Sequence, residues 1–226
     1  MNKISLNHIS FILDGNKRWA RRNNLNETEG YKKGINKIYE IVQYCYKNKI
    51  EYVTMFLLST ENIKRSNKKS FINLVKITFR EFIEKINNIG KIKVNVIGEK
   101  VNLSDDIISL IKELETQNIK NYNLTLNLAF NYGFNNELYS VIKKILSTSD
   151  KDFDESKIND YFYLNAQPDP DVLIRTGGYK RLSNFILKNL IYTELNFIDT
   201  LWPDLSLKEL DEIIKNFKQI NRNYGL

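Results

Sequence analysis

The chain shows two spacings of hydrophobic residues. Short apolar runs, too short for helices, predict buried strands. They lie at residues 9–13, 52–58, 92–97, 124–130, 172–174 and 195–198. Longer segments with apolar residues three or four positions apart predict helices at residues 34–46, 71–86, 105–114, 137–146 and 206–220. Strands separated by helices predict an α/β fold, with a mostly parallel central sheet of about six strands flanked by helices.

Residues 147–170 form the longest stretch without a clear pattern. We expect a connecting segment with a short helix there rather than a domain boundary, because the following strand is needed for the sheet. A length of 226 residues suits one domain of this class, so residues 1–226 are expected to form a single domain.

The composition shows that the chain is positively charged. The formal net charge is +7, with 42% hydrophobic and 27% charged residues. A lysine-rich solvated surface explains the charge most simply, whereas an anionic partner such as diphosphate, nucleic acid or a lipid surface is the alternative. The sequence shows no apolar run of eighteen residues and no basic-then-apolar start, so neither a membrane span nor a secretory signal is expected. Its single cysteine, Cys45, cannot form an intramolecular disulfide, which fits a reducing cytoplasm.

Parallel sheets bind ligands beyond the carboxyl ends of their strands, so the residues after each strand are the first candidates. The first strand is followed by Asp14, Gly15, Asn16, Lys17, Arg18 and Trp19. Gly15 permits a sharp turn, and the helix start that follows offers free N–H groups to an anion. Arg18 is suited to phosphate, and Asp14 to Mg²⁺ held against a diphosphate. The alternative is a plain turn in which Asp14 or Asn16 caps a helix.

The sequence HISFILDGNKRWA at residues 8–20 resembles the opening signature of the cis-prenyltransferase family. The resemblance implies an enzyme that adds isopentenyl diphosphate units to an allylic diphosphate. It places the allylic diphosphate on residues 15–18, beside Trp19 and Tyr31, with the cofactor Mg²⁺ near Asp14. His8, which opens the strand, is expected to be structural.

A second motif, after the second strand, resembles the family pattern Ser-x-Glu-Asn-x-x-Arg through Ser59, Thr60, Glu61, Asn62 and Arg65. Without the resemblance, these residues can simply cap the next helix. The resemblance gives them substrate contacts and gives Asn62 a part in removing the proton. A neutral amide is a weak base, so a diphosphate oxygen or a water held by Asn62 is the alternative acceptor. The basic segment 64–69 is expected to be a loop that closes over substrate.

A third motif, at residues 171–178 and 181–185, resembles the family's isopentenyl diphosphate pocket. The resemblance implies phosphate contacts from Arg175 and Arg181, a hydroxyl from Ser183, and a contact from Leu182. Two surface arginines in a glycine turn would explain the same residues in isolation. In a fourth motif, Glu194 matches a glutamate that contacts metal, in some members within a neighbouring subunit. A homodimer is therefore expected.

Two positions near the expected allylic site depart from the family pattern. Glu27 stands where many members have arginine, and Tyr31 where many have histidine. Tyrosine can still donate a hydrogen bond. Glu27 cannot replace a cation, and Arg21, Arg22 or Lys32 are candidates to compensate for it.

The resemblance covers almost the whole chain and implies an apolar tunnel for the growing product. Its expected wall is the second strand with Phe71, Leu74, Phe79 and Phe82, although these residues can also simply fill the core. Undecaprenyl diphosphate made from farnesyl diphosphate is the leading product hypothesis. Leu57, where long-chain members often have alanine, keeps a shorter product open. The expected location is the cytoplasm, with peripheral contact at the inner membrane face.

Three other interpretations remain. One is an irregular synthase of the same fold that joins two allylic diphosphates. Another is a non-catalytic partner subunit, which the presence of Asp14, Asn62 and Arg65 disfavours. The third is a nucleic-acid-binding module, for which a basic stripe interleaved with aromatic residues is expected. Here the candidate arginines instead follow strands beside glycines, so no nucleic-acid partner is predicted.

Overall fold

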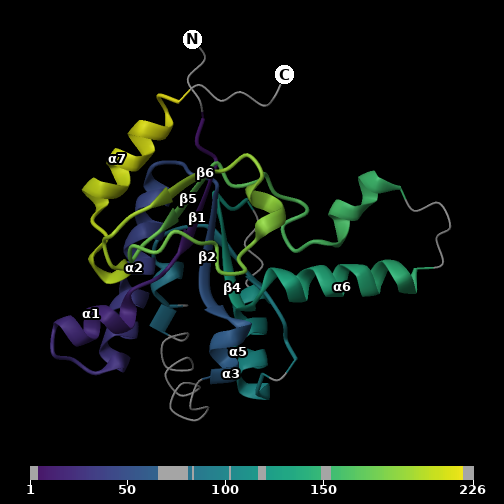
Figure 1. The fold of residues 1–226 in the computed structure, drawn as a ribbon, viewed down its shortest axis with the longest axis horizontal. Coiled ribbons are helices and arrows are strands. Elements are labelled where there is room, and N and C mark those ends of the chain that lie inside the picture. Colours follow the sequence, from purple (N-terminus) through teal and green to yellow (C-terminus); the bar gives the residue numbers. More distant parts are fainter. Residues whose placement is uncertain are drawn as a thin grey trace.

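A six-stranded sheet forms the centre of the computed structural model, which describes residues 5–65, 81–82, 84–101, 103–116, 121–148 and 154–220 (Figure 1). The strands are β1 (His8–Ile12), β2 (Tyr52–Ser59), β3 (Ile92–Ile97), β4 (Leu124–Tyr132), β5 (Val172–Arg175) and β6 (Glu194–Phe197). Their order is β3-β4-β2-β1-β5-β6, and every pairing is parallel. The predicted fold class is confirmed, because helices flank this sheet.

The helices agree with the apolar spacing, except at their polar ends. They are α1 (Asn16–Arg22), α2 (Glu27–Lys47), α3 (Thr60–Arg65), α5 (Asp105–Thr116), α6 (Phe134–Ser147) and α7 (Leu207–Phe217), with 3₁₀ helices η1 (Glu155–Tyr161), η2 (Leu187–Leu190) and η3 (Trp202–Asp204). Helix α2 begins earlier than predicted because its first turn is polar and is capped by Asn26, whose side chain accepts a hydrogen bond from the backbone N–H of Glu29. Most of the predicted helix 71–86, including Phe71, Leu74 and Phe79, lies outside the described residues.

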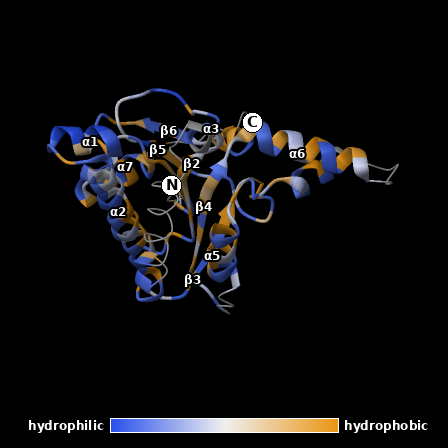
Figure 2. Ribbon diagram, turned by 90° about the horizontal axis from the view of Figure 1, so that it is seen from below, coloured by the Kyte–Doolittle hydropathy of each residue, from blue (hydrophilic) through white to orange (hydrophobic). Residues whose placement is uncertain are grey.

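The two faces of the sheet pack against different partners. Alternate strand residues such as Phe11, Met55 and Leu126 form the larger core with α2, α5 and α7, and Phe82 is buried in this same core. Strand positions in between, such as Phe56, pack on Phe185 and neighbouring apolar residues that follow β5 in the chain. In Figure 2 the helices contain both hydrophilic and hydrophobic residues. Burial on both faces explains why the strands read as continuous apolar runs.

Neutral polar residues are buried on the second face, in the amino-terminal half of the sheet. The Nδ1 of His8 lies 2.7 Å from the carbonyl oxygen of Pro168, and its Nε2 lies 2.8 Å from the Thr54 hydroxyl oxygen. Asn127 donates to Thr54 at 3.0 Å and to Gln167 at 2.7 Å. Burial lowers the pKa of His8 to about 4, so its ring is neutral at physiological pH. His8 therefore has the structural role expected of it.

Candidate substrate-binding and catalytic site

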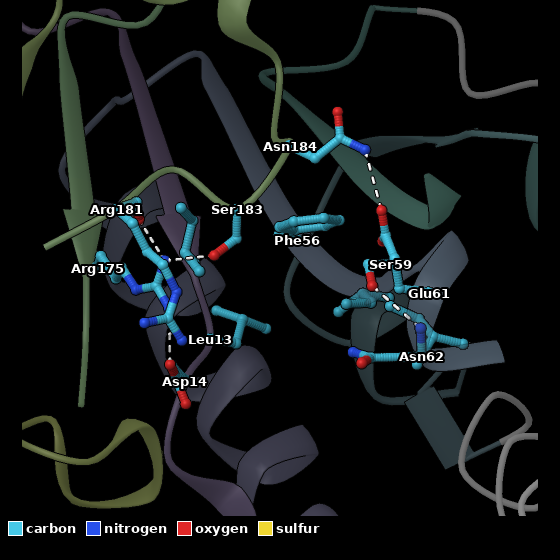
Figure 3. Close-up of a pocket in the computed structure, with 13 residues that line it drawn as sticks. Leu13, Asp14, Phe56, Ser59, Glu61, Asn62, Arg175, Arg181, Ser183 and Asn184 are labelled. Atoms are coloured by element: carbon cyan, nitrogen blue, oxygen red, sulfur yellow. Dashed lines mark hydrogen bonds and ion pairs between the residues drawn. The ribbon is translucent and has the colours of Figure 1, made fainter. Parts of the chain in front are cut away.

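A pocket of about 600 Å³ opens at the carboxyl ends of β1, β2 and β5 (Figure 3). Apolar residues at the ends of β1 and β2 and polar residues from the following turns line it. The lining residues are Ile12, Leu13, Asp14, Phe56, Leu57, Leu58, Ser59, Glu61, Asn62, Arg175, Arg181, Ser183 and Asn184. The fold thus brings together predicted residues from three motifs that are far apart in the sequence. The lining therefore offers arginines to an anionic group and apolar side chains to a hydrocarbon chain.

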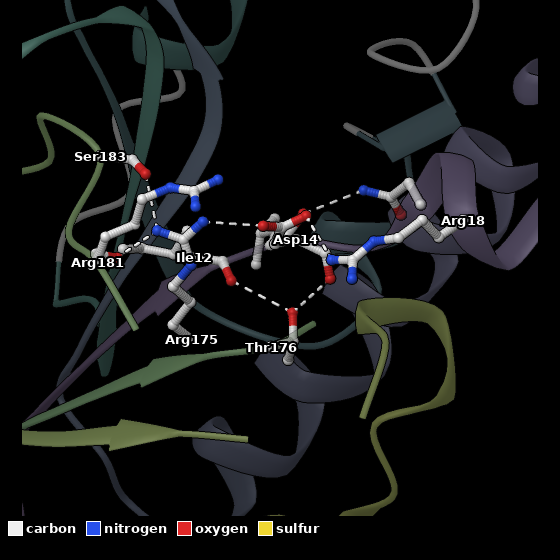
Figure 4. A network of polar contacts seen from close by, with 9 residues as sticks. Ile12, Asp14, Arg18, Arg175, Thr176, Arg181 and Ser183 are labelled. Carbon is white, nitrogen blue, oxygen red and sulfur yellow. Dashed lines mark hydrogen bonds and ion pairs between the residues drawn. The ribbon is translucent and has the colours of Figure 1, made fainter. Parts of the chain in front are cut away.

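Asp14 is at the centre of a polar network (Figure 4). One carboxylate oxygen accepts from Arg175 Nη2 at 2.9 Å, and the other from Arg18 Nη2 at 3.1 Å. The Asp14 backbone oxygen accepts from the Thr176 hydroxyl at 2.7 Å and from the Trp202 N–H at 3.0 Å. These bonds fix Asp14 between the turns that follow β1 and β5.

Arg175 is the most buried cation of the pocket, with its side chain 3% exposed. Its Nη1 donates to the Ser183 hydroxyl at 2.7 Å and to the backbone oxygen of Arg181. Its Nε is buried and has no hydrogen-bond partner among the described residues. Arg181 itself is exposed and lines the pocket. Asp14 contacts the guanidinium groups of Arg18 and Arg175, and Arg181 lines the same pocket. These three cations outnumber the carboxylates of Asp14 and Glu61, and this excess of positive charge favours an anionic ligand.

The turn after β1 depends on Gly15. Its φ is 120°, and a Cβ there would lie 2.9 Å from the side chain of Leu201. Gly15 is also the N-cap of α1, with no side-chain hydrogen bond to the helix start. The alternative in which Asp14 or Asn16 caps this helix is therefore wrong. Asn16 instead donates to the backbone oxygen of Leu13 at 3.2 Å.

The motif after β2 combines capping with a pocket position. The Ser59 hydroxyl accepts from the backbone N–H of Asn62 at 3.2 Å, so the capping interpretation holds for Ser59 while both residues also line the pocket. Thr60 is buried at the start of α3. Burial raises the pKa of Glu61, but hydrogen bonds from its own N–H, from Ser59 and from Asn184 outweigh it and leave the pKa lowered. The side chain of Arg65 and the segment 66–80 lie outside the described residues.

Asn184 lines the pocket without having been predicted. Its φ of 64° is in the left-handed region, which asparagine tolerates better than most residues. Its Nδ2 donates to Glu61 at 3.2 Å, while its Oδ1 and backbone oxygen accept from the first N–H groups of α6 at 3.0 and 2.8 Å. Asn184 thus connects the turn of Ser183 with α3 and α6. A Ser-Asn pair in a tight turn was the available signal, but the partners are distant in sequence.

Several predicted allylic-site residues lie outside the pocket lining. Lys17 pairs with Glu27 at 2.7 Å, which raises the pKa of Lys17 and lowers that of Glu27. Trp19 Nε1 donates to Asp204 at 2.7 Å. Burial raises the pKa of Tyr31. In the third motif, Leu182 packs on the core of the second face.

The three candidates to compensate for Glu27 all have acidic partners. Arg21 contacts Glu27 itself at 3.3 Å, and Lys32 contacts Glu29 at 3.2 Å. Arg22 contacts Asp204. None of the three is therefore an unpaired cation.

Glu194 lies at the amino-terminal end of the parallel strands, whereas Asp14 lies at their carboxyl end. Glu194 opens β6 in register with Val172, whereas Arg175, at the other end of β5, is in register with Phe197. One chain therefore does not bring the two predicted metal ligands together. Within the described ranges, no group of three or more His, Cys, Asp or Glu residues is arranged to hold a metal ion.

Comparison with known proteins agrees with this geometry. A family model described as "Putative undecaprenyl diphosphate synthase" matches residues 12–225. The chain is 37% identical to the isoprenyl transferase of Aquifex aeolicus (strain VF5), over 96% of this chain and 95% of that protein. The chain belongs to the cis-prenyltransferase family. It is therefore an enzyme that transfers prenyl groups, and the cationic pocket suits the diphosphate substrates of that activity.

Two further relatives show how far the cis-prenyltransferase similarity extends. The chain is 35% identical to the geranylgeranyl-diphosphate-specific tritrans,polycis-undecaprenyl-diphosphate synthase of Thermococcus kodakarensis, over 96% of this chain and 86% of that protein. It also resembles the crystal structure of lavandulyl diphosphate synthase from Lavandula x intermedia in complex with dimethylallyl diphosphate. That match has a TM-score of 0.89 and 26% identity, over 98% of each chain. These relatives differ in product, so the product of this chain has to be argued separately.

Proposed function

We propose that the chain condenses isopentenyl diphosphate units with farnesyl diphosphate to give undecaprenyl diphosphate. The observation that carries the proposal is the pocket itself, in which Asp14 lies between Arg18 and Arg175 next to the apolar residues 56–58. A cationic mouth beside an apolar wall fits a substrate with a diphosphate head and a prenyl chain. The resemblance of these motifs to the cis-prenyltransferase signatures supports the same assignment.

The allylic diphosphate is assigned to the turn at residues 15–18 and to Arg18. Its C–O bond breaks in the reaction, and negative charge grows on the departing diphosphate. Arg18 and the N–H groups that open α1 stabilise this charge. Fixed donors of this kind act most strongly where water is excluded, so the buried end of the pocket is the expected place of bond cleavage.

Isopentenyl diphosphate is assigned to Arg181, Ser183 and Arg175. Its double bond attacks the allylic carbon, a C–C bond forms, and a proton leaves to restore a double bond. Asn62 lines the same pocket and can orient the acceptor of this proton. Since an amide is a weak base, the acceptor is assigned to a diphosphate oxygen or a water beside Asn62.

Asp14 is the carboxylate that fits Mg²⁺ at this site. Mg²⁺ is commonly held by one or two carboxylates together with substrate phosphates, and when bound it neutralises charge on the diphosphate. Two guanidinium groups already contact Asp14, so we expect the ion to bind together with diphosphate and not alone. Glu194 has a metal role in this proposal only from a neighbouring subunit. Calorimetry should detect Mg²⁺ binding in the presence of inorganic pyrophosphate and not in its absence, and full turnover with EDTA would contradict the proposal.

A homodimer is proposed through the exposed apolar residues of α6. Leu138, Ile142 and Leu146 are spaced four residues apart and are 36%, 47% and 81% exposed. This spacing places them along one side of the helix, and α6 extends away from the sheet in Figure 2. Burial of such a stripe against a second copy would remove apolar surface from water. Light scattering should give twice the chain mass for the wild type and the chain mass for Ile142→Glu.

The location of the reaction is proposed to be the cytoplasm, with the membrane contacted peripherally. A long apolar product and a net charge of +7 support contact with an anionic lipid surface. In the described part of the chain, no helix has the length and apolar character needed to cross a membrane. Flotation with anionic and with neutral vesicles tests the contact, since binding should require the anionic lipid.

A second candidate is an irregular synthase that joins two allylic diphosphates. The structural similarity to lavandulyl diphosphate synthase favours it. The higher identity to isoprenyl transferases and to an undecaprenyl-diphosphate synthase favours chain elongation. Incubation with Mg²⁺, labelled isopentenyl diphosphate and dimethylallyl, farnesyl or geranylgeranyl diphosphate separates them. Elongation gives labelled polyprenyl diphosphates, whereas product from dimethylallyl diphosphate without the label would identify the irregular reaction.

A further inference from the structure

The ring of Tyr179 lies beside the guanidinium group of Arg18 and those of two arginines that line the pocket, Arg175 and Arg181. Its centroid is 4.2 Å from the Cζ of Arg181, 4.8 Å from that of Arg18 and 5.9 Å from that of Arg175. All three distances are within the range of cation–π attraction. We propose that Tyr179 is a positioning residue that holds the arginines of both diphosphate sites at their working separation. The inference rests on the function proposed above and extends it to a residue outside the family motifs discussed.

Three cations so close together repel one another, and Asp14 offsets this for two of them. Its carboxylate contacts Arg18 and Arg175. In the described part of the chain, no carboxylate pairs with Arg181, whose Cζ is the closest of the three to the ring. An aromatic face attracts a guanidinium group without neutralising it. Arg181 can therefore be held in place and still keep its full charge for a diphosphate, which a carboxylate partner would compete with.

The backbone before Tyr179 is built to bring this ring close to Arg18. Gly177 and Gly178 have φ values of 84° and 78°, and a Cβ on Gly177 would lie 2.4 Å from Arg18 Nη2. Their N–H groups donate to the backbone oxygens of Thr200 and Ile198, both at 2.8 Å. The turn is thus anchored to the segment after β6, which fixes where the ring begins. Although the residue is 44% exposed, its position does not depend on burial.

The ring serves both substrates. Arg18 is assigned to the allylic diphosphate, and Arg181 to isopentenyl diphosphate. Removal of the ring should therefore weaken both substrates together, in contrast to the loss of either arginine alone. The chemistry at the allylic carbon uses neither the ring nor its hydroxyl, so turnover at saturation should change little.

The chain offers a matched control for the substitution. Tyr122 is also 44% exposed, and its ring centroid lies 5.3 Å from the Nζ of Lys93, outside the pocket lining. Tyr179→Leu, Tyr179→Phe and Tyr122→Leu should be compared with the wild type. The readouts are KM for each substrate, kcat, and the affinity for inorganic pyrophosphate by calorimetry, which requires no turnover.

We expect Tyr179→Leu to raise both KM values and the pyrophosphate Kd by about 5- to 30-fold, the scale of one or two cation–π contacts, with kcat within about threefold. Tyr179→Phe and Tyr122→Leu should match the wild type. Unchanged affinities in Tyr179→Leu, or equal losses in Tyr179→Phe, would overturn the inference. If the wild type shows no turnover, the proposed function is contradicted instead. The pyrophosphate affinities would still decide the role of the ring.

Discussion

Polar side chains gather at both ends of the strands, and the two clusters differ in charge. In the amino-terminal half, His8, Thr54 and Asn127 are fully buried and bonded to one another in a chain. At the carboxyl ends, Asp14 and Arg175 are charged, and further arginines surround them. The first group is neutral and its donors have acceptors, whereas the second has an excess of cations and an unpaired Nε on Arg175 in the part of the chain that the structure describes.

The difference separates a structural network from a ligand site. Burial of neutral groups is tolerated when each has a hydrogen-bond partner, and the His8 network meets this condition without any ligand. The carboxylate of Asp14 does not balance the positive charge of the arginines around it, so a bound anion would neutralise the excess. Both groups are held by the same sheet, since His8 opens β1 and Asp14 follows its carboxyl end.

The largest expected effect is the loss of Asp14. Asp14→Ala should lower kcat by at least about a hundredfold, because a group that organises charge around the leaving diphosphate is removed. The protein should stay folded, since Asp14 is at a strand tip. Asp171 is the matched control at the other end of the sheet, where its carboxylate accepts from the N–H groups of Asn7 and His8 at 2.8 and 3.1 Å. Similar losses in Asp14→Ala and Asp171→Asn would remove the distinction between the two ends.

The neutral end should instead determine how stability depends on pH. The pKa of His8 is about 4 in the folded chain against 6.5 when unfolded. Below pH 6.5 the unfolded chain binds a proton that the folded chain does not, so stability falls as the pH drops from 6.5 to about 4. The total loss from this group is about 3 kcal/mol.

Chemical denaturation at several pH values measures this slope. His8 is the one histidine of the sequence, so His8→Gln should flatten the slope between pH 6.5 and 5, where few carboxylates titrate. An equal slope in the variant would show that another group is responsible.

Substitutions of Arg175 and Arg181, the two arginines that line the pocket, should affect substrate binding alike but protein stability differently. Both Arg175→Ala and Arg181→Ala should raise KM for isopentenyl diphosphate more than KM for the allylic substrate. Arg175→Ala should also lower the free energy of unfolding by about 1–3 kcal/mol, because its side chain is buried and its partners lose their donor. Arg181→Ala should leave it within about 0.5 kcal/mol, as is usual for an exposed residue. Steady-state kinetics and urea unfolding measure both quantities, and equal unfolding losses would contradict the assigned roles.

The smallest expected effect is on product length, at the apolar wall of the pocket. Leu57 lines the pocket, and the β2–β4 register shifts between Phe56 and Leu58, so the strand pairing is irregular at Leu57. Simple alternation along β2 therefore does not give the direction of the Leu57 side chain. Leu57→Ala should lengthen the products if Leu57 limits the chain, as read by mass spectrometry. An unchanged distribution would remove Leu57 from the argument.

The fold was predictable because its signals are local. Apolar runs located the six strands of the described part of the chain, and the residues after the predicted strands identified Asp14, Ser59 and Arg175. The partners of these residues were not predictable, since they depend on which turns meet. Asn184 contacts Glu61 across 123 positions of sequence. For the same reason, only the strand register shows that Glu194 lies at the amino-terminal end of the strands, away from Asp14.

The most direct test of the central claim is a crystal structure with isopentenyl diphosphate and a non-reactive thiodiphosphate analogue of farnesyl diphosphate. We expect two diphosphate groups beyond the carboxyl ends of β1 and β5. One should contact Arg18 and the turn at residues 15–18, and the other Arg181 and Ser183, with the prenyl chain against residues 56–58. Diphosphate density at the amino-terminal end of the strands, or both diphosphate groups on the same arginine, would contradict this assignment.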